Sequence, residues 1–340
     1  MAQRKWVLLL ILTVLGAHLV TRHALHPNQP ELEQPASLYS VQLRDDLRRL
    51  FVDAIASAKE EVVLSSYGLA DPRIIHALRD KAEEGVPVHV LVDRAATKNA
   101  HQLLGPHIHT VQRSSEGLMH IKALVIDGTT SFLGSANFTF SSLRIHSNLM
   151  LGIAQKDLSR TIRNYLLGLP AKGRHSPPDM PYVIDLANQM TTLWLCPQEA
   201  ALQALLELIR QANSSLHIAM FTWTHPLITE AVINAYHRGV DVAIVMDRDQ
   251  GKGVNKKVLD ELRQQDIPTY LSDGDGLLHH KLAIIDGTTL VVGSANWTRS
   301  AFQRNDDCFL VLQPLTNQQK DKLARLWSIC LHDSDRHATD

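Results

Sequence analysis

Two short segments of the chain carry the same chemically active side chains in the same order. The first runs from His120 to Asn137 and reads HIKALVIDGTTSFLGSAN, and the second runs from His279 to Asn296 and reads HHKLAIIDGTTLVVGSAN. The offset between the two copies is constant (279 − 120 = 159). Each copy supplies an imidazole, an ammonium and an amide, which together can neutralise and orient the oxygens of a phosphodiester anion. An internal repeat of this kind is expected to organise the whole fold.

Two histidines allow a phosphodiester bond to be cleaved by a covalent route. A neutral imidazole can attack phosphorus, and a second, protonated imidazole can give a proton to the departing alkoxide. Lys122 and Lys281 would supply the positive charge that a metal ion otherwise brings. We therefore expect neither a metal nor another cofactor.

Each copy also predicts a hairpin of two strands. Four apolar residues in each copy, 123–126 and 282–285, indicate a short buried strand. Residues two apart on a strand share a face, so each histidine points the same way as its lysine. Asp-Gly pairs at 127–128 and 286–287 then favour a tight turn. We expect Asp127 and Asp286 to hold this turn, with a lysine as a further partner, rather than to act as the base.

Four residues follow the hairpin at matching places and complete each copy. Gly134 and Gly293 would let the backbone approach a ligand closely. The neutral hydrogen-bonding residues that we expect to contact the phosphate are Ser135, Asn137, Ser294 and Asn296.

These segments resemble the phospholipase D superfamily, whose pattern is H-x-K-x4-D-x6-G-S-x-N, and both copies match it at every fixed position. The resemblance implies a metal-independent site in which the two halves meet on a pseudo-twofold axis and a phosphohistidine forms. The signature residues that it assigns to catalysis are His120, Lys122, Asp127, His279, Lys281 and Asp286.

The chain departs from the family pattern downstream of the G-S-x-N residues, in the first half. The family usually carries N-x-E there, and its acid holds the far nitrogen of the histidine. Asp307 lies 28 residues after His279 (307 − 279 = 28), whereas the same spacing after His120 reaches Asn148. A carboxylate fixes the tautomer and stabilises the imidazolium, but an amide can only orient the ring. This spacing assigns Asp307 to His279 and favours His279 as the more basic histidine. The resemblance implies His120 as the nucleophile, which is compatible if His279 is the general acid. The sequence leaves the two roles open, and a weakened first half is the alternative.

Each half shows the same order of elements around its motif. Helix, strand, helix and strand are predicted over 43–58, 61–68, 71–85 and 86–94, and again over 199–212, 215–223, 225–239 and 240–248. A last amphipathic helix is predicted over 317–331. Strands alternating with helices favour parallel pairing, so we predict an α/β fold of two pseudo-symmetric α-β-α sandwich halves.

The predicted domains follow from this order and from composition. The first half spans 37–171, a Pro-rich linker spans 172–181, the second half spans 182–332, and a polar tail spans 333–340. Residues 1–24 have basic Arg4 and Lys5 before an apolar run, which is typical of a signal anchor or signal peptide, and 25–36 form a linker. The absence of small residues before a cleavage point favours the uncleaved anchor, with the catalytic body outside the cytoplasm; secretion is the alternative.

Composition narrows the function. The 340 residues carry a net charge of −1, so the bulk charge gives no signal for nucleic acid. Cys196, Cys308 and Cys330 are unclustered, which indicates neither a zinc site nor a disulfide framework. We predict a membrane-anchored, monomeric phosphodiesterase that cleaves phospholipid to phosphatidic acid and a head-group alcohol. The alternatives are a nuclease acting on DNA or RNA, a cardiolipin-synthase-like phosphatidyl transferase, and an inactive scaffold that binds head groups.

Overall fold

The computed structural model describes residues 28–335. The expected signal anchor, residues 1–24, and most of the polar tail therefore lie outside the described residues. Within 28–335, no helix combines the length and the apolar character needed to cross a bilayer.

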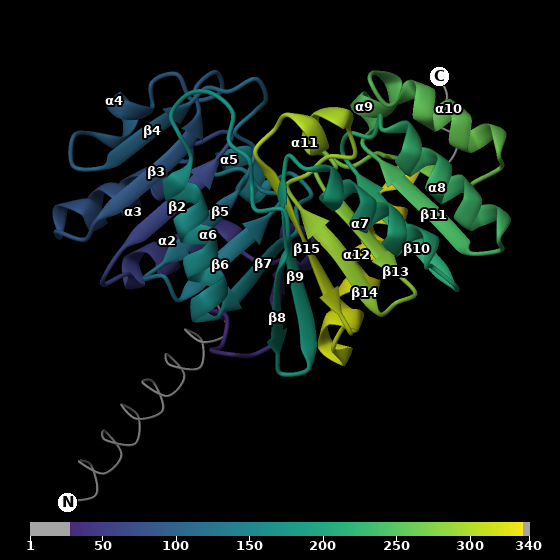
Figure 1. Ribbon diagram of the computed structural model, residues 1–340, viewed down its shortest axis with the longest axis horizontal. Helices are drawn as coiled ribbons and strands as arrows, with labels where there is room; N and C mark the ends of the chain where they lie inside the picture. Colours follow the sequence, from purple (N-terminus) through teal and green to yellow (C-terminus); the bar gives the residue numbers. More distant parts are fainter. Residues whose placement is uncertain (1–27, 336–340) are drawn as a thin grey trace, which may run out of the picture.

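Two mixed sheets form the two halves and lie side by side (Figure 1). The first has the order β1-β7-β6-β5-β2-β3-β4 and the second β16-β12-β11-β10-β13-β14-β15-β9-β8. The strands of the first sheet are β1 (Ser37–Tyr39), β2 (Val62–Ser66), β3 (Val88–Asp93), β4 (His109–Arg113), β5 (Ala123–Ile126), β6 (Thr130–Gly134) and β7 (Met150–Ala154). Those of the second are β8 (Tyr182–Leu186), β9 (Gln189–Cys196), β10 (Ser215–Met220), β11 (Asp241–Met246), β12 (Thr269–Ser272), β13 (Lys281–Ile285), β14 (Thr289–Gly293), β15 (Asp307–Gln313) and β16 (Ser334–Asp335).

The strand directions repeat from one half to the other. In the first half β2, β3 and β4 pair in parallel, and β5, β6 and β7 follow as antiparallel strands. In the second half β10, β11 and β12 are parallel, and β13, β14 and β15 are antiparallel. The predicted α/β fold with two pseudo-symmetric halves is confirmed. The predicted motif hairpins, β5–β6 and β13–β14, form the antiparallel part of each sheet together with β7 and β15.

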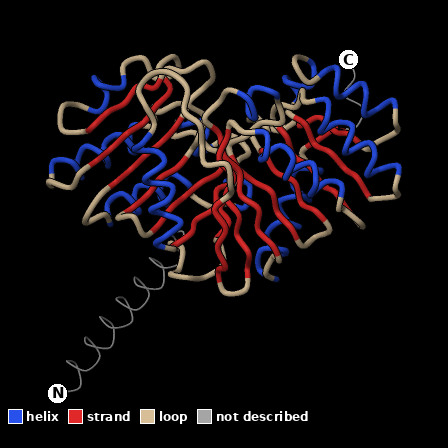
Figure 2. The backbone as a smooth tube through the Cα atoms, in the orientation of Figure 1, coloured by secondary structure: helices blue, strands red, loops and turns tan. Residues whose placement is uncertain are grey.

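Helices lie on the flanks of the sheets and between them (Figure 2). Several begin at a residue whose side chain caps the helix. At α3, the Asp71 side chain accepts the N–H groups of Arg73 and Ile74, and Pro72 occupies the first turn. The helices are η1 (Val41–Leu43), α2 (Leu47–Ser57), α3 (Pro72–Glu83), α4 (Ala100–Leu104), α5 (Phe140–Arg144), α6 (Lys156–Gly168), α7 (Glu199–Arg210), α8 (Pro226–His237), α9 (Arg248–Lys252), α10 (Lys256–Gln264), α11 (Arg299–Gln303) and α12 (Asn317–His332).

Three buried apolar clusters hold these layers together. One lies under α2 and α3, and one lies under α7 and α8. The third is shared, because it contains residues of both sheets together with the buried faces of α6 and α12. Burial of a common core makes the two halves one folded unit and fixes the junction at which the histidines meet.

The two motif hairpins turn as the sequence predicts. Asp127 and Gly128 both have positive φ (52° and 56°), as do Asp286 and Gly287 (53° and 61°). Three residues separate the paired strands, since Ile126 pairs with Thr130 and Ile285 with Thr289. Positive φ at the first two of them suits a tight hairpin turn, and aspartate with glycine adopts it at low cost. The turns therefore place each aspartate at the far end of a strand from its histidine.

Candidate active site

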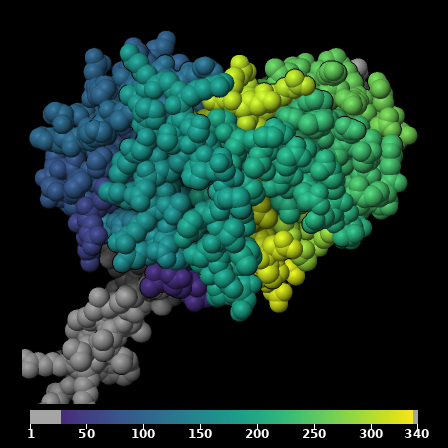
Figure 3. All heavy atoms as spheres, viewed as in Figure 1, coloured from purple at the N-terminus to yellow at the C-terminus, as the bar shows by residue number. Residues whose placement is uncertain are grey.

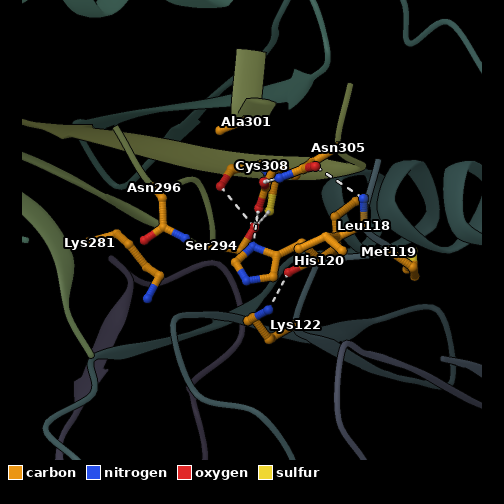
Figure 4. Close-up of polar contacts among 12 residues, drawn as sticks. Leu118, Met119, His120, Lys122, Lys281, Ser294, Asn296, Ala301, Asn305 and Cys308 are labelled. Carbon is orange, nitrogen blue, oxygen red and sulfur yellow. Dashed lines mark hydrogen bonds and ion pairs between the residues drawn. The ribbon is translucent and has the colours of Figure 1, made fainter. Parts of the chain in front are cut away.

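Each histidine lies just before the first strand of its hairpin, where a segment of the opposite half pairs with it. The backbone N–H of His120 donates to the Asp306 carbonyl at 2.9 Å, and that of His279 donates to the Ser147 carbonyl at 2.9 Å. Isolated bridges join Met119 to Asp306 and Ser147 to Leu278. These two equivalent contacts cross the junction and bring both motifs to one site (Figure 4).

The orienting groups of the histidines come from the opposite halves. His120 Nδ1 lies 2.7 Å from Asp307 Oδ1, and His279 Nδ1 lies 2.9 Å from Asn148 Oδ1. The assignment of Asp307 to His279 was therefore wrong: the equal spacing is real, but the crossed bridges exchange the partners. With Nδ1 engaged, Nε2 is the nitrogen that each ring presents to a substrate.

The two motif serines support these orienting groups instead of facing a phosphate. Ser135 Oγ donates to Asn148 Oδ1 at 2.8 Å, and Ser294 Oγ donates to Asp307 Oδ1 at 2.6 Å. Both serines are completely buried. Their expected role as phosphate ligands is corrected by this geometry, since their hydroxyl protons are already committed.

The glycines before these serines have a related role. A Cβ on Gly134 would lie 2.2 Å from the Leu149 carbonyl oxygen, and one on Gly293 would lie 2.3 Å from that of Cys308. The close approach that requires glycine is therefore to the neighbouring strand, β7 or β15, rather than to a ligand.

The motif asparagines keep their amide nitrogens available to the site. Asn137 Oδ1 accepts the Gly68 N–H at 3.4 Å, and Asn296 Oδ1 accepts the Thr222 N–H at 3.3 Å. Figure 4 shows Asn296 between Lys281 and the His120 ring. The fixed oxygen leaves each NH₂ group as a donor to a bound phosphodiester.

The motif lysines are buried against the histidine backbone. Lys122 Nζ donates to the His120 carbonyl at 2.6 Å, and Lys281 Nζ donates to the His279 carbonyl at 2.8 Å. Burial lowers the pKa of Lys122 to about 7 and holds that of Lys281 well below its usual value. A phosphodiester anion beside them would favour the charged forms and raise both pKa values.

Two aromatic rings line the site that the sequence reasoning missed. The Tyr67 ring centroid lies 5.7 Å from the His120 ring and 5.7 Å from Lys122 Nζ. The Phe221 centroid lies 4.8 Å from the His279 ring and 4.7 Å from Lys281 Nζ. Each ring face thus contacts a buried ammonium. Tyr67 directly follows β2 and Phe221 directly follows β10, and this equivalent position in the two halves could have indicated a shared role.

Two aspartates at the ends of β3 and β11 position the histidine segments. Asp93 Oδ2 accepts the Met119 N–H at 3.1 Å, and Asp247 Oδ2 accepts the Leu278 N–H at 3.0 Å. The repeated Asp-Arg pairs at 93–94 and 247–248 were visible in the sequence, but nothing local indicated this contact.

Asp127 and Asp286 belong to the hairpin tips and not to the reacting site. Asp127 accepts the backbone N–H groups of residues 59–61 at 2.7–3.0 Å, and Asp286 accepts those of residues 213–215 at 2.7–3.1 Å. Their structural role is confirmed, while the expected lysine partner is replaced by backbone donors. The catalytic assignment implied by the signature is corrected for both.

The two histidines differ in basicity. Burial lowers the pKa of His120, and the Asp307 carboxylate partly offsets that effect. The pKa of His279 lies well below its usual value because of burial and the charges of Lys281, Lys122, His120 and His146. Although burial raises the pKa of Asp307, contact with His120 lowers it below its usual value, so Asp307 is a carboxylate.

Cys196, Cys308 and Cys330 are buried free thiols. Within residues 28–335, no three histidine, cysteine or acidic side chains are grouped as a metal site requires.

Comparison with known proteins gives matches to both halves. The family model described as "Cardiolipin synthase, PLD-like domain" matches residues 51–169 and 205–327. The mitochondrial cardiolipin hydrolase of Xenopus tropicalis is 31% identical over 137 residues, which are 39% of this chain and 65% of that protein. A phospholipase D of Rickettsia prowazekii is 30% identical over 131 residues, 38% of this chain and 63% of that protein. The chain thus spans less than two thirds of the length of these relatives.

A solved structure shows the same arrangement of both halves. The phosphatidylserine synthase of Haemophilus influenzae superposes with a TM-score of 0.69 at 14% identity, covering 92% of this chain and 90% of that one. This likeness establishes the fold alone. Because the two family matches together cover more than half of the chain, this protein belongs to the phospholipase D-like family and carries its domain twice.

Proposed function

We propose that the protein is a metal-independent phosphodiesterase that hydrolyses phospholipid to phosphatidic acid and a head-group alcohol. The observation that carries the proposal is the pair of crossed contacts, His120 with Asp307 and His279 with Asn148, which leave two Nε2 atoms facing one site. Two buried lysines and two asparagine amides surround that site and can stabilise a phosphorane-like transition state.

In the first step His120 is the nucleophile. Its Nδ1–H donates to Asp307, so the Nε2 lone pair is free to form the P–N bond. As the P–O bond to the head group breaks, the protonated Nε2 of His279 gives its proton to the alkoxide. The ring of a phosphohistidine is cationic, and the Asp307 carboxylate stabilises it in a way that the Asn148 amide cannot.

In the second step a water molecule enters the place that the head-group alcohol has left. His279, now neutral, takes a proton from this water, the water oxygen attacks phosphorus, and the P–N bond to His120 breaks. Phosphatidic acid leaves, His120 is restored as neutral imidazole, and His279 is again protonated. In the free site, burial and the neighbouring lysines hold the pKa of His279 well below its usual value. A bound phosphodiester anion favours the imidazolium and raises that pKa, so the proton that His279 donates is taken up with the substrate.

A lipid substrate is supported by three features. The relatives above are named as a cardiolipin hydrolase and a phospholipase D. Exposed apolar side chains flank the histidine segments, Leu118 (40% exposed) on one side and Ile145 (47%) on the other. The net charge of −1 gives no bulk attraction to a polynucleotide. Tethering by residues 1–24, with the catalytic body outside the cytoplasm, is part of the proposal.

The first test compares the wild type with His120→Ala and His279→Ala, each with chelator present. Phospholipid vesicles should be hydrolysed by the wild type only, with losses of at least about 100-fold in both variants. Single-stranded DNA is the comparison substrate. Cleavage of DNA without lipid turnover would move the activity to the nuclease class, and no turnover of either would indicate a binding scaffold.

A second test separates the roles of the two histidines. A p-nitrophenyl phosphodiester has a leaving group that needs no proton, so His279→Ala should still form the phosphoenzyme and His120→Ala should not. The phosphohistidine, measured as acid-labile label on the protein, should accumulate in His279→Ala. Label on the His120→Ala protein instead would reverse the two roles.

A further inference from the structure

A pocket of about 480 Å³ opens beside the reacting site on the His120 side. Asn296, a motif asparagine, is among its lining residues, so the pocket borders the place where the scissile phosphate would bind. The loop 114–118 forms one wall, and α11 with Arg304 forms the other. Figure 3 shows the α11 region, in yellow, at the upper junction of the two halves.

Two arginines in this pocket are free to meet an anion. Arg304 donates to the Ser300 hydroxyl at 2.6 Å and has no ion pair among the described residues. Arg94 is exposed, and its side chain likewise has no ion-pair partner within residues 28–335. Arginine presents a planar fork that matches the oxygens of a phosphate.

The other charges that line the pocket are already compensated. Arg113 is paired with Asp306, and Glu116 is paired with Arg174 at 2.9 Å. The Asp93 carboxylate accepts three backbone N–H groups, those of residues 95, 96 and 119. The two positive charges of Arg94 and Arg304 outnumber the one negative charge of Asp93, so the net charge of the pocket lining is positive and favours an anion.

The equivalent position next to His279 has no such pair of unpaired arginines among the described residues. Ile145 occupies the place of Arg304 (304 − 145 = 159). Arg248 corresponds to Arg94 but is paired with Asp273 at 2.6 Å. The repeat therefore provides an anion pocket on one side only, which would bind an asymmetric substrate in one direction.

We propose that this pocket binds a second phosphate of the substrate, one bridging unit away from the phosphodiester that is cleaved. The inference rests on the proposed phospholipase activity and defines its substrate class as lipids whose head group carries a further phosphodiester, as in diphosphatidylglycerol. No aromatic side chain lines the pocket, whereas Leu118 contributes apolar surface. A polynucleotide would call for a ring on which a base can stack, so the lining favours lipid.

The test compares two lipids that differ in the second phosphate. The full-length protein is assayed in detergent micelles that contain equal mole fractions of either diphosphatidylglycerol or phosphatidylglycerol. The wild type should show the higher kcat/KM for diphosphatidylglycerol. In Arg94→Gln and Arg304→Gln the ratio of the two kcat/KM values should fall by about tenfold, mainly through KM, because each loses a charge-assisted contact.

Arg248→Gln is the matched control, since it removes the corresponding arginine from the opposite side and should keep the wild-type ratio. A wild-type ratio near one, or a ratio that Arg94→Gln and Arg304→Gln leave unchanged, would overturn the subsite. Turnover of neither lipid would instead remove the proposed function on which it rests. A single-stranded oligonucleotide is assayed in parallel; arginine effects confined to it would assign the pocket to polynucleotides and overturn the lipid class.

Discussion

Asp307 and Asn148 occupy equivalent places beside the two histidines, yet only Asp307 carries a charge. The Asn148 amide is well matched to its surroundings, because Nδ2 donates to the Ser142 carbonyl at 3.0 Å and to the Ser142 hydroxyl at 3.2 Å. In the other half Ala301 takes the place of Ser142, and Asn305 donates to Asp307 Oδ2 at 3.3 Å. The difference thus involves several residues and makes His279 the less basic histidine.

Rebuilding the acidic arrangement beside His279 should change the pH dependence of catalysis. The triple variant Ser142→Ala, His146→Asn, Asn148→Asp copies Ala301, Asn305 and Asp307. A carboxylate near an imidazole raises its pKa by one unit or more, roughly. In the substrate complex, whose pKa values kcat reports, His279 acts when protonated, so kcat falls as pH rises through the pKa of His279. The falling limb of kcat against pH should therefore move up by about one unit.

Asp307→Asn is the control for that pH profile, because it should shift the rising limb of kcat against pH to lower pH and leave the falling limb in place. Removing the carboxylate lowers the pKa of His120, so the neutral nucleophile persists to lower pH. A triple variant whose falling limb stays in place would contradict the assignment of His279 as general acid.

At the scale of elements, the two hairpin tips tie the motif strands to the ends of α2 and α7. Asp286 accepts the N–H groups of residues 213–215 and the Ser214 hydroxyl at 3.0 Å. Although its partial burial raises the pKa of Asp286, these hydrogen bonds lower it below the usual value. The folded state therefore favours the ionised carboxylate.

Asp286→Ala should lower the free energy of unfolding by roughly 1–2 kcal/mol at neutral pH, since several donors lose their acceptor. A depressed pKa contributes stability above the unfolded value of about 3.9 and loses it as pH falls through the folded value. The difference in Tm between wild type and variant should thus close below about pH 4. Thermal unfolding followed by circular dichroism measures it. A large loss of kcat at unchanged Tm would instead point to a catalytic role.

At the scale of the whole molecule, the junction of the halves is less symmetric than the motifs. Arg113 and Asp306 form a buried ion pair across it, with Nε 2.5 Å from Oδ2 and Nη2 3.0 Å from Oδ1. Both side chains are at most 2% exposed. The equivalent pair in the repeat is Ser272 and Ser147, so one side of the junction is joined by charge and the other is not.

Asp306→Asn should destabilise the fold by about 3–5 kcal/mol, because it leaves a guanidinium buried without its counter-charge. The double variant Arg113→Ser, Asp306→Ser copies the other side and should recover much of that loss. Denaturant unfolding of the wild type, both single variants and the double variant forms a double-mutant cycle. Strictly additive effects would show that the two side chains act independently.

The repeat, the order of strands and helices, and the phosphodiester chemistry could all be predicted from the sequence. Helix patterns that start with a proline in the first turn, as at α3 and α8, and Asp-Gly turns are local signals, so they can be recognised without tertiary structure. The continuous strands β7 and β15 were not predicted, because burial on both faces removes the alternation that marks a strand.

Tertiary structure alone decided how the site is shared between the halves. Asp307 holds His120 across 187 residues of sequence, Ser135 and Ser294 support the orienting groups, and Asp127 and Asp286 stay at the hairpin tips. A repeat reports which residues are equivalent, but an intramolecular twofold junction can pair each residue with its own half or with the other. Only the packing of the two sheets against a common core makes that choice, and here it exchanges the partners.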